Sequence, residues 1–159
     1  MKHRRMLCYL SACLFAMGFC GCSDPGAVID NNTALPNKVW PYNNRVGYNF
    51  KIDDAGARYN FYINLRVTGD YKYSNLFVLV SDPVKKGAVA RYELKLAQPD
   101  GQWLGKGSGN LYSFRIPFKS NYKFPAAGIY HIRIEQNMRD NPLHNVSDVG
   151  LRVEKAPSQ

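Results

Sequence analysis

A strict alternation of apolar and polar residues in the stretch YNFYINLRVT, residues 59–68, constrains the fold of this chain more than any other feature. Every second position carries a large apolar side chain, at Tyr59, Phe61, Ile63, Leu65 and Val67. Successive side chains of a strand point to opposite faces of a sheet, so a sustained period of two predicts a strand that buries one face.

Five further segments repeat this alternation, at residues 46–52, 92–96, 112–118, 130–134 and 149–153. The segment LFVLV, residues 76–80, is apolar on both sides, which predicts a central strand covered on both faces. Turn-forming residues separate the segments, and no stretch shows a capped helical stripe. In a chain of 159 residues this pattern predicts an all-β fold, a single antiparallel β-sandwich of about seven strands, with a single barrel as the alternative.

The N-terminus has the pattern of an export signal. MKHRR is basic, and the apolar run that follows it, residues 6–19, is too short to span a bilayer. The run ends in Phe-Cys-Gly-Cys, which resembles the lipobox of bacterial lipoproteins with Cys22 as the acylated residue. We therefore expect a signal peptide over 1–21, a lipidated N-terminus and flexible tether over 22–38, a β-sandwich domain over 39–156 and a tail over 157–159.

The cysteines support the same interpretation. All four lie in the first 22 residues, at Cys8, Cys13, Cys20 and Cys22. Cleavage before Cys22 leaves one cysteine at the very end of the mature chain, so no internal disulfide can form. The alternative is an uncleaved hydrophobic anchor. Several fatty acyl chains such as palmitate would hold the protein firmly, because each buried methylene contributes about 0.8 kcal/mol.

The charge pattern does not predict nucleic-acid binding. The formal charge is +9, and removal of the signal peptide with Lys2, Arg4 and Arg5 leaves about +6, which is spread along the chain. Several basic residues are expected on the outward side of strands: Lys51, Arg66, Arg91, Lys95, Arg115, Arg133 and Arg152. This surface either meets acidic lipid headgroups, acidic sugars or a partner protein, or is an ordinary soluble sheet surface whose charges protect its edges.

Residues for catalysis or metal binding are sparse. His131 and His144 have no paired cysteine, so they make no zinc pattern, and no nucleophile elbow accompanies them. The three glutamates Glu93, Glu135 and Glu154 are expected on the solvent side of strands. We expect no enzyme, no metal and no cofactor, and a hydrolase that uses His131 or His144 is the least favoured alternative.

Two aromatic loops are candidate binding sites. One carries Tyr71 and Tyr73, and the other, DGQWLGKGSGN at residues 100–110, carries Trp103 and Lys106. The second loop lacks the spacing of a phosphate-binding loop and precedes a strand rather than a helix. Exposed aromatic rings could stack on sugars or anchor a protein interface, whereas buried rings would close one end of the core.

Four further blocks stand out in this sequence: YKYSNLF at 71–77, PDGQWLGKGSG at 99–109, IEQNMR at 134–139 and DVGLRV at 148–153. Together they resemble the GldH family of gliding-motility lipoproteins from Bacteroidetes, and the resemblance covers roughly residues 40 to 155. It implies a lipid-anchored, non-enzymatic component associated with gliding motility and the type IX secretion machinery.

The resulting hypothesis is an envelope lipoprotein that binds other envelope proteins. The candidate interaction surface consists of Tyr71, Tyr73, Trp103, Lys106 and Arg139. The alternative function is a carbohydrate-binding module in which Trp103, Tyr71 and Tyr73 form the stacking platform. The protein is expected at the outer membrane facing the periplasm, because no acid cluster follows Cys22; exposure at the cell surface is the alternative.

Overall fold

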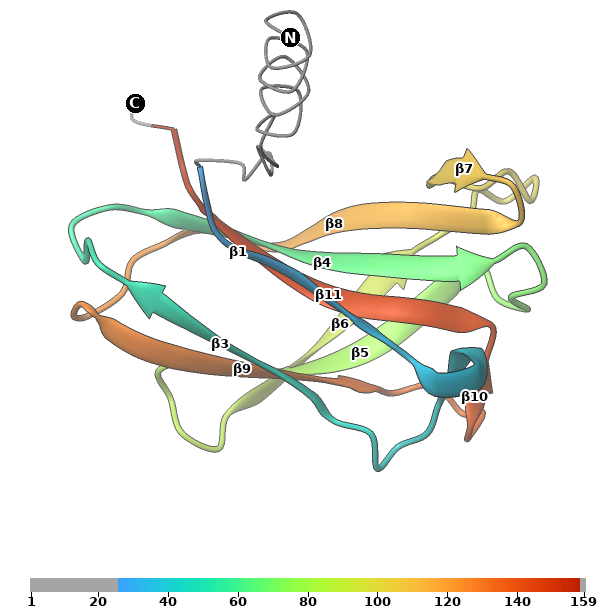
Figure 1. Cartoon of the computed structure of the whole chain (residues 1–159), viewed down its shortest axis with the longest axis horizontal. Helices are drawn as coiled ribbons and strands as arrows, with labels where there is room; N and C mark the ends of the chain where they lie inside the picture. Colours follow the sequence, from blue (N-terminus) through green and yellow to red (C-terminus); the bar gives the residue numbers. More distant parts are fainter. Residues whose placement is uncertain (1–25, 158–159) are drawn as a thin grey trace, which may run out of the picture.

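The computed structural model describes residues 26–157, and they form an all-β structure (Figure 1). The expected lipidation site at Cys22 lies outside these residues. The elements in chain order are β1 (Ala27–Ala34), the 3-10 turn η1 (Pro36–Lys38), β2 (Val39–Trp40), β3 (Val46–Ile52), β4 (Tyr59–Thr68), β5 (Asn75–Ser81), β6 (Val89–Lys95), β7 (Lys106–Ser108), β8 (Leu111–Tyr122), β9 (Gly128–Gln136), β10 (Leu143–His144) and β11 (Val146–Lys155).

Two larger antiparallel sheets face each other in Figure 1. The five-stranded sheet has the order β1-β11-β4-β8-β7, the four-stranded sheet has the order β3-β9-β5-β6, and β10 pairs with β2 in a small third sheet. No helix among residues 26–157 is long and apolar enough to cross a bilayer. The prediction of an all-β antiparallel fold is therefore confirmed.

The expected number of about seven strands is too low, because this part of the chain contains eleven. The six alternating segments correspond to β3, β4, β6, β8, β9 and β11, and LFVLV corresponds to β5. The four strands without a sequence signal are β1, β2, β7 and β10. Three of them have only two or three residues, and β1 has a single buried side chain, Ile29. Strands that are this short, or that bury so few apolar side chains, show no alternation of apolar and polar residues in the sequence.

The core lies between the two large sheets and contains the alternating apolar residues. The apolar side chains of β4 and β11 that face inward are all buried, including Phe61 and Leu151 with no exposed surface. Phe50 of β3 meets Phe61 edge to face, with ring centroids 6.4 Å apart, and Phe124 packs beside both rings. Full burial of such a side chain contributes about 1.5–3 kcal/mol, so these contacts hold the two sheets together.

The segment LFVLV corresponds to β5, an interior strand of the four-stranded sheet, but it is not covered on both faces as expected. Leu76, Val78 and Val80 are buried, whereas Phe77 and Leu79 on the other face are half-buried. The guanidinium of Arg91 lies 3.7 Å from the centre of the Phe77 ring, a cation–π contact. A neighbouring cation therefore partly covers this outer face.

The first strand corrects the expected tether over residues 22–38. Residues 27–34 form β1, which pairs antiparallel with β11 from Ala27 opposite Glu154 to Ala34 opposite Asp148. The hydroxyl of Tyr48 from the facing sheet donates to the carbonyl of Val149, 2.6 Å away, beneath this pair. The sequence of β1 is polar and gives no strand signal, because backbone pairing and polar contacts stabilise this strand.

A glycine at position 150 allows β1 to lie against β11. A Cβ added there would lie 2.6 Å from the carbonyl oxygen of Asn31 and would collide with the side-chain oxygen of Asn32. We predict that Gly150→Ala lowers the free energy of unfolding by about 1–3 kcal/mol, because one extra carbon overpacks this contact. Urea denaturation measures the loss, and hydrogen exchange should accelerate mainly in β1.

Gly107→Ala is the matched control, because its added Cβ would meet only the movable Tyr112 ring, 3.3 Å away, on an exposed edge strand. Equal destabilisation by the two substitutions would contradict the role assigned to Gly150.

Candidate interaction surface

The outer face of the five-stranded sheet carries polar residues that the strand register places side by side. Asp30 of β1 lies opposite Arg152 of β11, and Asn64 of β4 lies opposite Arg115 of β8. Opposite charges that face each other across neighbouring strands stabilise a sheet. The alternation that buries the inner face therefore assembles a polar network on the outer face.

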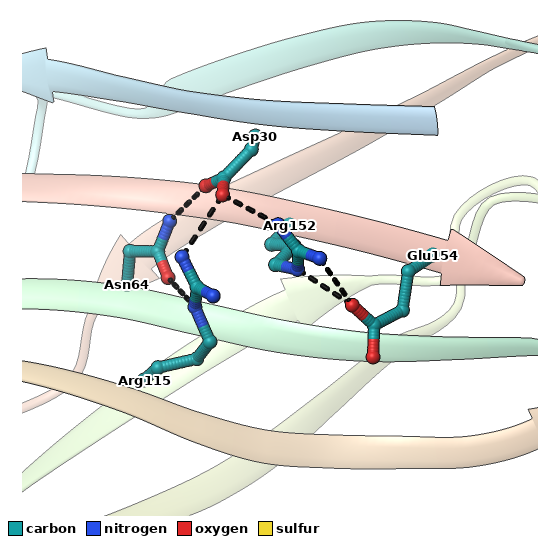
Figure 2. Close-up of polar contacts among 5 residues, drawn as sticks. All are labelled: Asp30, Asn64, Arg115, Arg152 and Glu154. Carbon is teal, nitrogen blue, oxygen red and sulfur yellow. Dashed lines mark hydrogen bonds and ion pairs between the residues drawn. The ribbon is translucent and has the colours of Figure 1, made fainter. Parts of the chain in front are cut away.

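Asp30 is the centre of this network (Figure 2). Its Oδ2 accepts from Nη1 of Arg152 at 2.8 Å and from Nη2 of Arg115 at 2.9 Å, and its Oδ1 accepts from the amide of Asn64 at 2.6 Å. Arg115 also donates its Nε to Oδ1 of Asn64 at 3.2 Å. On the other side, Nε of Arg152 donates to Glu154 at 2.7 Å. One carboxylate thus joins β1 to three other strands.

Arg152 lies on the outward side of its strand as expected, but it is not an open basic group. Its side chain lies on the outer face, but only 6% of it is exposed. A buried guanidinium requires carboxylate partners to offset the loss of its hydration, and Asp30 and Glu154 supply them.

A second ion pair lies beside the network. Arg66 of β4 donates Nε and Nη2 to the two carboxylate oxygens of Asp148, at 3.0 and 2.6 Å. The hydrogen bonds to Asp148 raise the pKa of Arg66, so the guanidinium stays charged. Asp148 is almost fully buried, while 46% of the Arg66 side chain remains exposed. The carboxylate holds the arginine in place and leaves its outer edge open to solvent.

A groove of about 770 Å³ includes Arg66 and Arg115 in its wall. Its lining comes from β1, β4, β8, β7, β11, the end of β6 and the loop between β6 and β7: Asn32, Asn64, Leu65, Arg66, Lys95, Leu104, Lys106, Ser113, Phe114, Arg115, Ile116, Pro117 and Asp148. We call this the basic groove, because it is lined by four cations and one carboxylate. Its volume is in the range of ligand-binding clefts.

The five residues of the expected interaction surface lie in different surroundings. Lys106 lines the basic groove and is exposed. Trp103 lies in the preceding loop, half-buried, and its ring stacks on Tyr112 with centroids 5.0 Å apart. Tyr71 is 5% exposed and donates its hydroxyl to the carbonyl of Asn75. Burial raises the pKa of Tyr71, which is typical of a core residue.

The other two residues, Tyr73 and Arg139, line a second and smaller groove of about 340 Å³ together with Phe77 and Met138. The Tyr73 hydroxyl donates to Asp140 at 2.5 Å, and this bond raises the pKa of Tyr73. Two blocks of the family resemblance, 71–77 and 134–139, thus meet in space.

The sugar-stacking platform of Tyr71, Tyr73 and Trp103 is not supported. The Tyr71 and Tyr73 rings meet edge to face at 73°, and Tyr71 is buried, so the two rings offer no common flat surface. The Trp103 ring is stacked on the protein's own Tyr112. Packing at the end of the core explains Tyr71 and Trp103 better than contact with a glycan.

The two histidines lie apart from both grooves. His131 places Nδ1 2.8 Å from the side-chain oxygen of Asn49, and His144 is exposed at the end of β10. Within residues 26–157, neither histidine forms a hydrogen bond with a serine or an ion pair with a carboxylate, so this part of the chain presents no catalytic triad around them.

Comparison with known proteins places these features in a family. A family model described as GldH lipoprotein matches residues 27–153, a range that begins with β1 and not at residue 40 as expected. A gliding motility lipoprotein GldH homolog of Christiangramia forsetii is 36% identical over 119 residues, which cover 68% of this chain and 74% of the relative. The gliding motility lipoprotein GldH of Flavobacterium johnsoniae is 29% identical over 126 residues, which cover 74% of this chain and 78% of the relative.

The Asp30 network generates a stability prediction. We expect Asp30→Asn to lower the free energy of unfolding by about 1–3 kcal/mol, because it removes the charge that compensates the buried Arg152. Asp53→Asn is the matched control: its carboxylate pairs with Lys51, and both side chains are at least 70% exposed. The control substitution should lower the free energy of unfolding by less than about 1 kcal/mol. Urea denaturation at neutral pH compares the two, and equal losses would contradict a structural role for Asp30.

Proposed function

The chain belongs to the GldH lipoprotein family, and on that premise we propose that it is a non-enzymatic envelope component associated with gliding motility and the type IX secretion machinery. It acts by binding other envelope proteins. The observation that carries this proposal is the family match, which spans nearly all of the described domain. The open basic groove supports a binding role, because it is large enough for part of a partner.

The proposal includes a lipid anchor on Cys22, after removal of residues 1–21, at the outer membrane with the domain facing the periplasm. Ala27, the first residue of β1, lies only five residues after Cys22 in the sequence. Five residues span at most about 18 Å. With this anchor the start of β1 lies within about 18 Å of the bilayer, so the β-sandwich formed by the two facing sheets is held close to the membrane.

The position of β1 also orients the domain on the membrane. Its first residue marks the anchored end of the five-stranded sheet, and β7 lies at the opposite end (Figure 1). From Ala27 the strand runs to Ala34, which lies opposite Asp148, and Asp148 in turn lies opposite Arg66. At about 3.3 Å per residue, the groove cation Arg66 is about 23 Å farther along the sheet than the anchored end. The groove thus lies away from the anchored end, where other envelope proteins can reach it.

Lipid attachment is tested by metabolic labelling with an alkyne analogue of palmitate. We expect wild type to be labelled and Cys22→Ala to be unlabelled, because acylation requires that thiol. Cys20→Ala is the control and should remain labelled, since alanine is common at this position of a lipobox. Labelling that persists in Cys22→Ala would refute the anchor assignment.

Partner binding is tested by chemical crosslinking in intact cells, followed by purification of the anchored protein and mass spectrometry. We expect motility or secretion components among the crosslinked proteins. They should be depleted when Cys22→Ala releases the domain from the membrane. Recovery of no such component from cells that contain the full machinery would count against the proposed function.

A further inference from the structure

We propose that the basic groove binds an extended acidic segment of a partner protein, one that carries carboxylates at alternate positions. This inference rests on the proposed function and names the surface and the partner chemistry that it requires. The argument begins with the charges in the groove. Lys95 and Lys106 are exposed, and neither ammonium group has a hydrogen bond or an ion pair with residues 26–157. An anionic ligand would supply the ion-pair partner that these two ammonium groups lack within residues 26–157.

The two arginines of the groove also keep free donors. Arg66 uses Nε and Nη2 on Asp148, and Arg115 uses Nε on Asn64 and Nη2 on Asp30. Nη1 of each guanidinium has no partner among the described residues. About half of each side chain is exposed. Arginines held from behind by carboxylates present these free groups at fixed positions, and arginine is suited to bind carboxylates.

The register of the sheet sets the spacing of a matching ligand. Arg66 lies opposite Ser113, and Arg115 is two residues along from Ser113 on the same face of β8, so the two arginines are diagonal neighbours. Such neighbours are about 7–8 Å apart. Side chains on one face of an extended peptide repeat about every 6.6–6.8 Å. Carboxylates at positions i and i+2 of an extended segment therefore match the spacing of these two arginine positions on the sheet.

Lys106 extends the same pattern by one strand. It lies opposite Ser113 on β7, so a single row crosses the sheet from Arg66 through Ser113 to Lys106. A segment that crosses the groove can then meet a third cation. Leu104 in the groove wall is 53% exposed and offers an apolar contact between the charges.

The edge of β8 indicates that recognition depends on side chains and not on strand addition. β7 pairs only with Leu111–Ser113 of β8, which leaves the rest of that edge without a neighbouring strand. Pro117 lies in this part of the edge and has no backbone N–H to donate. A proline at an edge limits pairing with a further strand. The groove cations then provide the attraction for the segment.

The location of the groove favours a protein over lipid headgroups as the source of the acidic groups. Arg66 and Lys106 lie about 23 Å along the sheet from the anchored end of β1, and Arg115 lies about 17 Å from it. Electrostatic attraction between exposed charges is largely screened beyond about 8 Å at physiological ionic strength. The headgroups around the anchor are therefore too distant for the groove of a domain standing on the membrane.

The test uses the full-length lipidated protein in detergent and fluorescent blocked peptides, with affinity measured by anisotropy. The probe alternates glutamate and threonine over eight residues. One comparison peptide replaces every glutamate by glutamine, and another has the same composition with its four glutamates in one block. We expect the alternating acidic peptide to bind at least about tenfold more tightly than the glutamine peptide, and more tightly than the block peptide.

The decisive variant is Lys95→Glu/Lys106→Glu, which changes only unpaired exposed groups of the groove and should leave the fold intact. We expect it to weaken binding of the alternating peptide at least about tenfold. Lys86→Glu/Lys123→Glu has the same change in net charge, at exposed positions outside the groove, and should bind like wild type. Equal binding by both double variants would overturn the proposal, as would equal binding of the glutamine peptide.

Two further probes distinguish an acidic protein segment from other anionic ligands. Vesicles rich in anionic lipid and an oligogalacturonate are offered in place of the peptide. Groove-dependent binding of either one, with no binding of the peptide, would overturn the assignment of a protein partner. If Lys95→Glu/Lys106→Glu still crosslinks to motility components in cells, the proposed function stands and the groove assignment fails. If no component is crosslinked by wild type, the proposed function itself fails, whatever the peptide binding.

Discussion

The apolar inner face that β4 and β11 share determines where the other elements lie. These two strands are neighbours in the interior of the five-stranded sheet, and their inward side chains are buried to within 2%. A shift of the register by one residue would turn every one of these side chains to the outer face. The free-energy cost of exposing these side chains fixes the register of the sheet. The facing sheet packs its own apolar side against the apolar face that this register creates.

The same register creates the outer face, where the forces are of a different kind. Because the inner positions are apolar, the intervening positions bring Asp30, Arg152, Asn64 and Arg115 into contact across four strands. Arg152 is buried among them and depends on its carboxylates. The first strand is therefore held by backbone pairing and by charge, although its sequence offers little hydrophobic surface. This attachment matters for an anchored protein, because β1 is the strand that follows the anchor.

The sequence predicted those parts of the structure that follow from local periodicity. The six alternating segments and the apolar run LFVLV are all strands. Tyr71 and Trp103 pack against the domain, which was one of the two interpretations of the aromatic loops. β1 was missed because the partners of Asp30 lie far along the chain: Arg152 is 122 residues away. No local pattern can report such a pairing. Lys106 was recognised as a candidate from its loop, but Arg66 and Arg115 join it only through the register of β4, β8 and β7.

The network and the groove share residues, and this has a physical consequence for binding. Asp148 holds Nε and Nη2 of Arg66 before any ligand arrives, and Asn64 and Asp30 hold Nε and Nη2 of Arg115. A flexible arginine loses side-chain entropy when it binds an anion, whereas a fixed one has lost most of it during folding. A ligand carboxylate at Nη1 leaves the existing hydrogen bonds in place, so binding need not weaken the attachment of β1. The carboxylates that stabilise the sheet thereby also prepare its outer face for an acidic partner.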